Sequence, residues 1–460
     1  MPLSIVDFPY LADCTKLASS LCALPDFVWL DSGKPQATLS RFDIICAGAR
    51  AYVVDGDAEQ INSLVSQTAK LSPDELSQLD LLDVPFAGGV IGFFDYESNH
   101  KAHDMPKEAS RKGASRALAF KQTFIIDHRR KRSLFIDISA PSEPSQFLSS
   151  LQAFFSAPNQ EHQDRSPEAP NSTEVQSRSN TQDPAPTLMR SDQSKASFCE
   201  AIRNIHEHIR EGDAYQINFS HEFSGENHES AFSLYLRCRE QLAAPYSCFT
   251  QFEGRSILSF SPERFVAANG RSVLTQPIKG TIKRGKNETE DQQLAKTLLS
   301  SEKDRSENVM IVDLLRNDFS KSCKPHSVKV TKLFELKSFQ NVHHLVSSIE
   351  GELEDEVSHW QFFFNCFPGG SITGAPKRRA MQIIFELERR LRGIYCGSIA
   401  YQSVHGRFDS SIAIRTVEFE NQVARCAGGA GITIESNPES EFQETLSKIR
   451  PLLDALQERV

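Results

Sequence analysis

The segment Pro277-Ile278-Lys279-Gly280-Thr281 places a lysine directly before a glycine and shortly after a proline. Proline fixes its own φ and removes one amide donor, and glycine lets another group approach the backbone closely. A single lysine is most often a solvated surface charge. A lysine held away from water has a lowered pKa instead, and its neutral amine can then act as a nucleophile. This segment alone does not decide whether Lys279 is a solvated surface charge or a buried nucleophile.

Four glutamates could work with such a lysine. Glu263 has apolar residues on both sides in the sequence, so burial would raise its pKa and make it a general acid; the alternative is a surface carboxylate. Glu307 shares one face of an expected helix with apolar residues, or else it only interacts with the helix dipole. Glu441 and Glu444 fall outside the apolar stripe of the C-terminal helix, and this periodicity favours solvated side chains. Separated carboxylates hold Mg²⁺ loosely, together with waters and an anionic substrate, so the candidate metal ligands are Glu307, Glu441 and Glu444.

Glycine-rich segments give the clearest indication of anion binding. Residues 367–377, FPGGSITGAPK, run directly into an expected helix, whose first N–H groups would face a carboxylate or phosphate. Thr373 and Lys377 could add side-chain donors there, but the spacing is not that of a P-loop. Residues 427–432, AGGAGI, could form a second bare backbone surface, or simply a tight crossing of strands.

Two further polar residues lie in apolar strand-like segments. Arg415 is expected on the same side of a strand as Ala413 and Val417, and a buried arginine often holds an anion. His344 precedes an apolar segment, where a histidine packed in the core is the commoner outcome.

The elements that must position these residues include a predicted hairpin. Residues 256–268 and 271–276 are expected to be its strands, with Asn269-Gly270 as a tight turn. This register pairs Glu263 with Gln276 and would place Glu263 and Lys279 on opposite faces. Prolines in both strands predict that the regular ladder ends near Glu263, so the separation of the two groups is not fixed by the sequence.

Three regions are expected along the chain. Residues 1–156 read as a first region of strands, including 27–30, 42–47, 51–54, 86–96 and a hairpin at 123–137. Residues 157–195 are rich in Ser, Pro, Gln and Asn and predict a linker or surface loop. Residues 196–460 begin with a helix that ends near Gly212 and contain most of the motifs.

Composition excludes several classes of protein. The 460 residues are 39% hydrophobic and 24% charged, as in soluble globular proteins, and the net charge of −9 argues against nucleic-acid and anionic-membrane partners. No apolar run is long enough to cross a membrane, and the N-terminus does not resemble a secretory signal. The ten cysteines contain no CxxC pair, which disfavours zinc, and scattered thiols are typical of the reducing cytoplasm, the expected location.

The motifs together resemble those of the chorismate-utilising enzymes. The resemblance covers roughly residues 198–458 and rests on PIKGT, DRSENVMIVDLLRND, VHHLVSSI, FPGGSITGAPKRRAMQII, YCGSIAY and GGAGI. It implies an α+β fold like that of anthranilate synthase component I, with two packed antiparallel β-sheets and outer helices.

The resemblance also implies roles for single residues. Glu307 and Glu444 would hold Mg²⁺ against the ring carboxylate of the substrate, with Glu441 as a third candidate ligand. Glu263 would protonate the departing 4-hydroxyl of chorismate, and His344 would lie near the ring carbon that loses a proton when anthranilate is formed. The candidate substrate-binding residues are Gly280, Thr281, Thr373, Lys377, Tyr395, Arg415, Gly429, Ala430 and Gly431.

Two positions indicate the subfamily. Salicylate and isochorismate synthases carry a lysine, which activates water, where this chain has Gln216, and anthranilate synthases carry alanine where it has Lys279. A lysine at 279 is the pattern of the aminodeoxychorismate synthases. It implies that Lys279 attacks carbon 2 of chorismate and that ammonia then adds at carbon 4, giving 4-amino-4-deoxychorismate for 4-aminobenzoate and folate synthesis. The alternatives are the large component of anthranilate synthase and a non-catalytic chorismate-binding or regulatory subunit.

The resemblance further implies a tryptophan pocket and a partner. The pocket, structural or regulatory, would comprise Ser32, Leu39, Ser40, Arg41, Phe42, Pro245, Tyr246 and Ser247. Ammonia is expected from a separate glutaminase subunit. None of the ten cysteines lies in the G-x-C-x-G setting of a glutaminase nucleophile, and the family match leaves no stretch for a fused glutaminase domain.

Overall fold

The computed structural model of the chain describes residues 3–33, 40–109, 113, 115–139, 145–157, 188–242, 244–338 and 342–457. Leu39 of the predicted tryptophan pocket and most of the predicted linker lie outside these residues. No described helix is long and apolar enough to cross a membrane.

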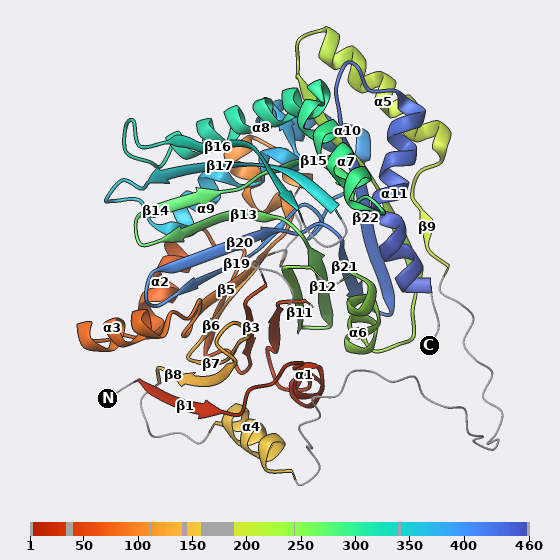
Figure 1. Cartoon of the computed structure of the whole chain (residues 1–460). Coiled ribbons are helices and arrows are strands. Elements are labelled where there is room, and N and C mark those ends of the chain that lie inside the picture. Colours follow the sequence, from red (N-terminus) through yellow and green to blue (C-terminus); the bar gives the residue numbers. More distant parts are fainter. Residues whose placement is uncertain are drawn as a thin grey trace, which may run out of the picture.

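Two antiparallel sheets form the centre of the described structure (Figure 1). The larger, sheet A, contains in spatial order β1 (Ser4–Phe8), β8 (Arg132–Asp137), β7 (Gln122–Asp127), β3 (Phe42–Cys46), β2 (Val28–Asp31), β11 (Tyr246–Phe252), β12 (Arg255–Ser261), β21 (Thr416–Glu420), β22 (Val423–Ile432), β10 (Gln216–Glu226) and β18 (Gly374–Ala375), with β9 (Arg190–Ser191) beside β10. Sheet B contains β15 (Ile278–Lys283), β17 (Val342–Glu352), β14 (Ser272–Thr275), β13 (Arg264–Asn269), β20 (Arg407–Ile412), β19 (Ser398–Ser403), β5 (Gly89–Phe94), β6 (Arg116–Phe120) and β4 (Ala51–Val54), with β16 (Lys329–Ser338) beside β17.

The sheets pack face to face through a layer of apolar side chains. Ile44 of β3 in sheet A and Ile91 and Phe93 of β5 in sheet B belong to this buried layer. Alternation of side chains along each strand leaves a second apolar set facing outward, and this set needs helices to cover it.

Helices cover both outer faces of the sheets. Sheet A is covered by α1 (Thr15–Leu21), α4 (Gln146–Ser156), α5 (Lys195–Arg210), α6 (Ala231–Leu242), α10 (Lys377–Glu388) and α11 (Pro438–Gln457). Sheet B is covered by α2 (Ala58–Thr68), α8 (Glu302–Ser320) and α9 (His359–Cys366), with α7 (Glu288–Ser300) against β15, while α3 (Pro73–Leu82) packs on β7 and β8. The predicted α+β architecture of two packed antiparallel sheets with outer helices is confirmed.

The two predicted regions form one unit. Strands β2 and β3 of the first region share sheet A with β11 and β12 of the second, since β2 pairs with β11. The predicted end of the linker at 195 is too late: Met189 is buried in the core and β9 pairs with β10. The chain therefore rejoins the folded body before α5.

The predicted strand 256–268 is in fact two strands in different sheets. It breaks at Pro262-Glu263, so that β12 stays in sheet A and β13 enters sheet B. The turn after β13 is Gly270-Arg271 and the ladder pairs Ala267 with Leu274, which corrects the predicted register by two residues. Proline cannot donate to a ladder, and this explains why the chain leaves sheet A here.

A second crossing lies beside the first. Strand β20 in sheet B and β21 in sheet A are joined through Arg415, which has φ +50° and is exposed, so the predicted buried strand position of this residue is wrong. The Ile412 N–H donates to the Glu263 carbonyl at 3.1 Å, and the Phe260 N–H donates to the Arg415 carbonyl at 3.0 Å. Two chain segments thus pass between the sheets side by side, and both bring a predicted site residue to the same place.

Candidate active site

A cavity of about 530 Å³ opens beside the two crossings. Its walls come from β15, β17, β22, α8, α11 and the crossing segments, which are distant in the sequence. The predicted site residues that line it are Glu263, Lys279, Gly280, Thr281, Glu307, His344, Tyr395, Arg415, Gly429, Gly431, Glu441 and Glu444.

Glu263 has the environment of a general acid. Its side chain is 8% exposed, and Ser371 Oγ donates to its Oε1 at 3.3 Å. Burial raises the pKa of Glu263 to about 7, although the positive charge of Lys279 opposes this. The carboxyl group therefore keeps a substantial protonated fraction at neutral pH, as a proton donor to a leaving group requires.

Lys279 lies in an irregular part of sheet B. The pairing of β15 with β17 shifts its register between Ile278 and Thr281, and such bulges re-aim side chains. Gly280 has φ +85°, and a Cβ there would lie 3.2 Å from the Asp304 side chain. Burial lowers the pKa of Lys279, although the carboxylate of Glu307 opposes this. A lowered pKa increases the fraction of neutral amine, the nucleophilic form.

The carboxylates of Glu307, Glu441 and Glu444 line the same cavity. Burial raises the pKa of Glu307, and its Oε1 lies 3.9 Å from Lys303 Nζ. Burial also opposes ionisation of Glu444, but Lys448 Nζ at 2.7 Å lowers its pKa.

Glu441 is buried on the last helix, where the predicted apolar stripe left it exposed. It is 5% exposed and accepts a hydrogen bond from Ser436 Oγ at 2.7 Å, because α11 buries Glu441, Thr445 and Ile449 along one stripe. The prediction of a solvated acid is therefore wrong for Glu441. Glu307, Glu441 and Glu444 together offer carboxylate oxygens in one cavity, a donor set that suits Mg²⁺.

Further polar groups line the cavity beside the glutamates. Thr281 Oγ1 and His344 Nδ1 are 2.8 Å apart, and burial together with the positive charge of Arg415 lowers the pKa of His344 to about 4. His344 is thus neutral at physiological pH. The Tyr395 hydroxyl lies 3.1 Å from where a Cβ on Gly429 would be, so only glycine keeps this backbone open.

Several predicted residues do not line the cavity. Thr373 is fully buried, and its hydroxyl donates to the Gly369 carbonyl at 2.8 Å. Lys377 Nζ is paired with Asp318 at 2.6 Å and donates to the Cys366 carbonyl, so the predicted role as a substrate donor is replaced by an internal ion pair. The Ala430 side chain packs in the core under α5 and α10.

Gln216 lies just behind the wall. A Cβ on Gly431 would be 2.6 Å from Gln216 Nε2, and neither amide atom of this buried side chain has a hydrogen-bond partner within the described residues. The Gln216 amide therefore lies behind Gly431, which lines the cavity.

The cavity also contains residues that sequence reasoning missed, namely Asn218, Lys303, Asp304, Ser371 and Lys448. Lys303 lies four residues before Glu307 and Lys448 four residues after Glu444, which is the spacing of an ion pair on a helix. This spacing could have identified both lysines from the sequence. Asn218 and Ser371 have none, because only the tertiary fold turns them inward.

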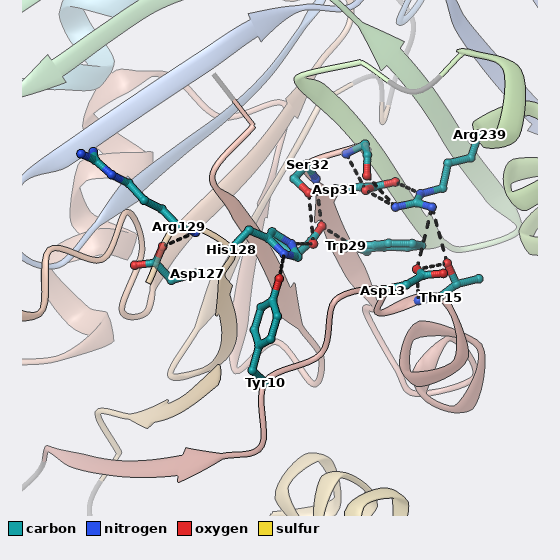
Figure 2. A network of polar contacts seen from close by, with 12 residues as sticks. Tyr10, Asp13, Thr15, Trp29, Asp31, Ser32, Asp127, His128, Arg129 and Arg239 are labelled. Carbon is teal, nitrogen blue, oxygen red and sulfur yellow. Dashed lines mark hydrogen bonds and ion pairs between the residues drawn. The ribbon is translucent and has the colours of Figure 1, made fainter. Parts of the chain in front are cut away.

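A second cavity of about 660 Å³ contains most of the predicted tryptophan-pocket residues. Those that line it are Ser40, Arg41, Phe42, Pro245, Tyr246 and Ser247. Ser32 does not: its N–H and Oγ both donate to Asp43, at 2.8 and 3.1 Å, within the network of Figure 2.

Asp31, labelled in Figure 2, lines this cavity, and the second buried carboxylate, that of Asp43, lies beside it next to Ser32. Asp31 accepts hydrogen bonds from Arg239 and Tyr235, and burial and the nearby Asp43 raise its pKa to about 6. Burial opposes ionisation of Asp43 too, but its contact with His128 at 2.5 Å lowers its pKa. The Asp31 bonds hold β2 against α6, and the Ser32 bonds to Asp43 leave Ser32 committed to the protein.

Comparison with known proteins agrees with this geometry. Residues 25–454 match the family described as chorismate binding enzyme. The chain is 34% identical over 450 residues to aminodeoxychorismate synthase component 1 of Salmonella typhimurium, covering 94% of each, and 35% identical over 373 residues to anthranilate synthase component 1 of Thermococcus kodakarensis, covering 81% of this chain and 79% of that protein. The crystal structure of anthranilate synthase component I from Streptococcus pneumoniae is similar with a TM-score of 0.70 at 27% identity, covering 98% of this chain and 92% of that one.

Proposed function

Because this chain belongs to the chorismate binding enzymes, we propose that it converts chorismate and ammonia into 4-amino-4-deoxychorismate. The observation that carries the proposal is the pair of opposite pKa shifts in one cavity: burial raises the pKa of Glu263 to about 7 and lowers the pKa of Lys279. These shifts favour a protonated acid and increase the fraction of neutral amine in the same cavity.

In the first step Lys279 is the nucleophile and Glu263 the acid. Lys279 Nζ forms a bond to carbon 2, both double bonds of the ring shift by one position, and the bond between carbon 4 and its hydroxyl oxygen breaks. Glu263 gives its proton to the departing oxygen, which leaves as water. The products of this step are a protonated secondary amine on Lys279 and an ionised Glu263.

In the second step ammonia replaces the lysine. Its lone pair forms the bond to carbon 4, both ring double bonds shift back, and the bond between carbon 2 and Nζ breaks, so Lys279 leaves as a neutral amine. The new ammonium group on carbon 4 returns one proton to Glu263. Chorismate and ammonia have then become aminodeoxychorismate and water, with both residues restored.

Magnesium is part of the proposal. Glu307, Glu441 and Glu444 are the residues that would hold the ion, since their carboxylates line the same cavity. When bound, Mg²⁺ supplies positive charge to the ring carboxylate of the substrate. Arg415, Thr281 and Tyr395 would bind the remaining polar groups of the ring, and this role is supported by their position in the cavity wall together with Gly429 and Gly431.

The partner, the tryptophan and the location stay proposals as well. Relatives named component 1 support a second component, which we take to be a glutaminase that delivers ammonia. The 660 Å³ cavity beside Arg41 and Tyr246 is the proposed tryptophan pocket. Ten free thiols support a reducing cytoplasmic location.

Anthranilate synthesis is the second candidate function, favoured by the anthranilate synthase relative at 35% identity. A binding subunit without activity is a third, and the shifted pKa values of Glu263 and Lys279 argue against it. The deciding assay supplies the purified chain with chorismate, ammonium chloride and Mg²⁺, and adds a lyase that turns aminodeoxychorismate into 4-aminobenzoate. We expect 4-aminobenzoate. Anthranilate as the main product would establish the second candidate, and chorismate binding without turnover the third.

A further inference from the structure

The crossing segment that carries Glu263 lies between the two large cavities. Glu263 lines the cavity of about 530 Å³, and its neighbour Arg264 lines the cavity of about 660 Å³. Successive side chains of an extended chain point to opposite sides, so this segment presents one residue to each cavity. The position of Glu263 therefore depends on how the Arg264 side of the segment is held.

Arg264 is held by a two-point ion pair with Asp409 of β20. Its Nε donates to Asp409 Oδ1 at 2.9 Å, and its Nη2 donates to Asp409 Oδ2 at 2.8 Å. The two side chains are 22% and 19% exposed, and the guanidinium carbon lies 5.6 Å from the centre of the Tyr246 ring. Two parallel bonds from a planar guanidinium group fix its direction as well as its distance.

This ion pair lies where the ladder between β13 and β20 is irregular. Arg264 pairs with Ser411, but the next pair is Ala267 with Asp409, so the register shifts between them. A bulge disrupts the regular ladder bonds and redirects side chains. The bond from Arg264 to Asp409 spans this bulge and ties the crossing segment to the regular part of the ladder.

The same strand also holds the segment at Glu263 and before it. The Glu263 carbonyl accepts from the Ile412 N–H at 3.1 Å, and Ser261 Oγ donates to the Ile412 carbonyl at 2.6 Å. Ile412 and Asp409 both belong to β20. Strand β20 therefore holds the chain on both sides of the Glu263 side chain, through the backbone on one side and through Arg264 on the other.

We propose that Arg264 is a positioning residue for Glu263, because its ion pair with Asp409 fixes the crossing segment so that the Glu263 carboxyl group meets the departing hydroxyl of the substrate. This inference rests on the proposed function. The Arg264 side chain lines the other cavity and not the active-site cavity, so it acts on the substrate only through Glu263. A displacement of about 1 Å at a reacting group can cost about a hundredfold in rate.

The test separates kcat from the KM for chorismate. Arg264→Met keeps an unbranched side chain and removes the ion pair; its kcat should fall about tenfold, and its KM should change less than about twofold because the substrate-binding groups stay in place. Arg407→Met is the matched control. Arg407 lines the same cavity and pairs with Asp83 at 3.0 Å, but it lies at the end of β20 remote from the crossing. Each variant loses one partly exposed ion pair, so their stabilities should fall alike, whereas Arg407→Met should keep its kcat.

A second comparison asks whether Arg264 acts through Glu263. In the Glu263→Gln background, Arg264→Met should change the remaining rate by less than about twofold, because the proton that needs positioning is already absent. Arg264→Lys keeps a charge that can pair with Asp409 but loses the two-point geometry, so it should recover part of the lost kcat.

An unchanged kcat in Arg264→Met, an equal fall in Arg407→Met, the same fall in the Glu263→Gln background, or no recovery in Arg264→Lys would overturn this inference. If Arg264→Met loses its cooperative thermal transition, Asp409→Asn is measured in its place, with the same outcomes. The wild-type chain is assayed first: failure to make aminodeoxychorismate refutes the proposed function itself, whereas wild-type activity with one of these outcomes in the variants refutes only the role of Arg264.

Discussion

Replacing Glu263 by glutamine should make the protein more stable and less active at the same time. The substitution keeps the size of the side chain and an oxygen that can accept from Ser371 Oγ. It removes the proton that we assign to the departing hydroxyl, and it removes an ionisable group from a site that is 8% exposed.

The gain in stability follows from the pKa of Glu263, raised by burial from 4.5 to about 7. Ionisation of such a carboxyl group costs stability in the folded state, and the cost grows between pH 4.5 and 7 and is complete above pH 7. Glutamine should therefore increase the free energy of unfolding by about 3 kcal/mol at pH 8 and by roughly 1 kcal/mol at pH 5.

The loss in activity follows from general acid catalysis, whose removal lowers rates by about 10² to 10⁴. The assay is the formation of 4-aminobenzoate with the added lyase, and urea unfolding at pH 5 and pH 8 gives the stabilities. Glu386→Gln, at an exposed position on α10, is the control and should change neither quantity. A Glu263→Gln enzyme with a rate within twofold of wild type would refute the role of Glu263, and equal stability gains at the two pH values would refute its raised pKa.

Three further predictions test other parts of the account. Glu307→Gln and Glu444→Gln should each weaken Mg²⁺ and chorismate binding together in calorimetric titrations, because both ligands meet at these carboxylates in the proposed site, and unchanged Mg²⁺ affinity in both would remove them as ligands. Lys377→Met should lower the free energy of unfolding by about 3 kcal/mol, because the buried negative charge of Asp318 loses the positive charge of Lys377. The control Arg378→Met removes an exposed ion pair and should lower the free energy of unfolding by under about 1 kcal/mol. Equal effects of the two substitutions would show that the buried pair is unimportant. The pure chain should use ammonium salts and not glutamine. Its rate should rise toward pH 7 because the concentration of free ammonia increases, and should then level off because the general acid Glu263 ionises. Product formation from glutamine by the chain alone would contradict the prediction of a separate glutaminase.

The candidate residues that contiguous motifs carry do come together as lining residues of one cavity. PIKGT supplies Lys279 and Thr281, and the long helix after Ser301 supplies Glu307, because local spacing places these residues within single elements. The apolar strand patterns of the first region were also correct, since a period of two directly marks a buried face.

What the sequence did not predict are the places where the chain changes sheets. The proline before Glu263 indicated the end of a ladder, but only the fold shows that the chain then enters the other sheet beside Arg415. The burial of Glu441 and of Lys377 could not be predicted, because it depends on polar contacts with Ser436 and with Asp318, and such contacts do not show in hydrophobic periodicity. Asn218 has no sequence signal, because its burial depends on three segments that meet only in the folded chain.

The most direct measurement of the central claim is the rate of aminodeoxychorismate formation by Lys279→Ala. Lys283→Ala is its matched control, since Lys283 lies on the same strand but is exposed. Without the nucleophile, we predict a fall of at least about a hundredfold in Lys279→Ala, with chorismate binding retained, and a rate close to wild type in Lys283→Ala. Undiminished product formation by Lys279→Ala would contradict the proposed chemistry.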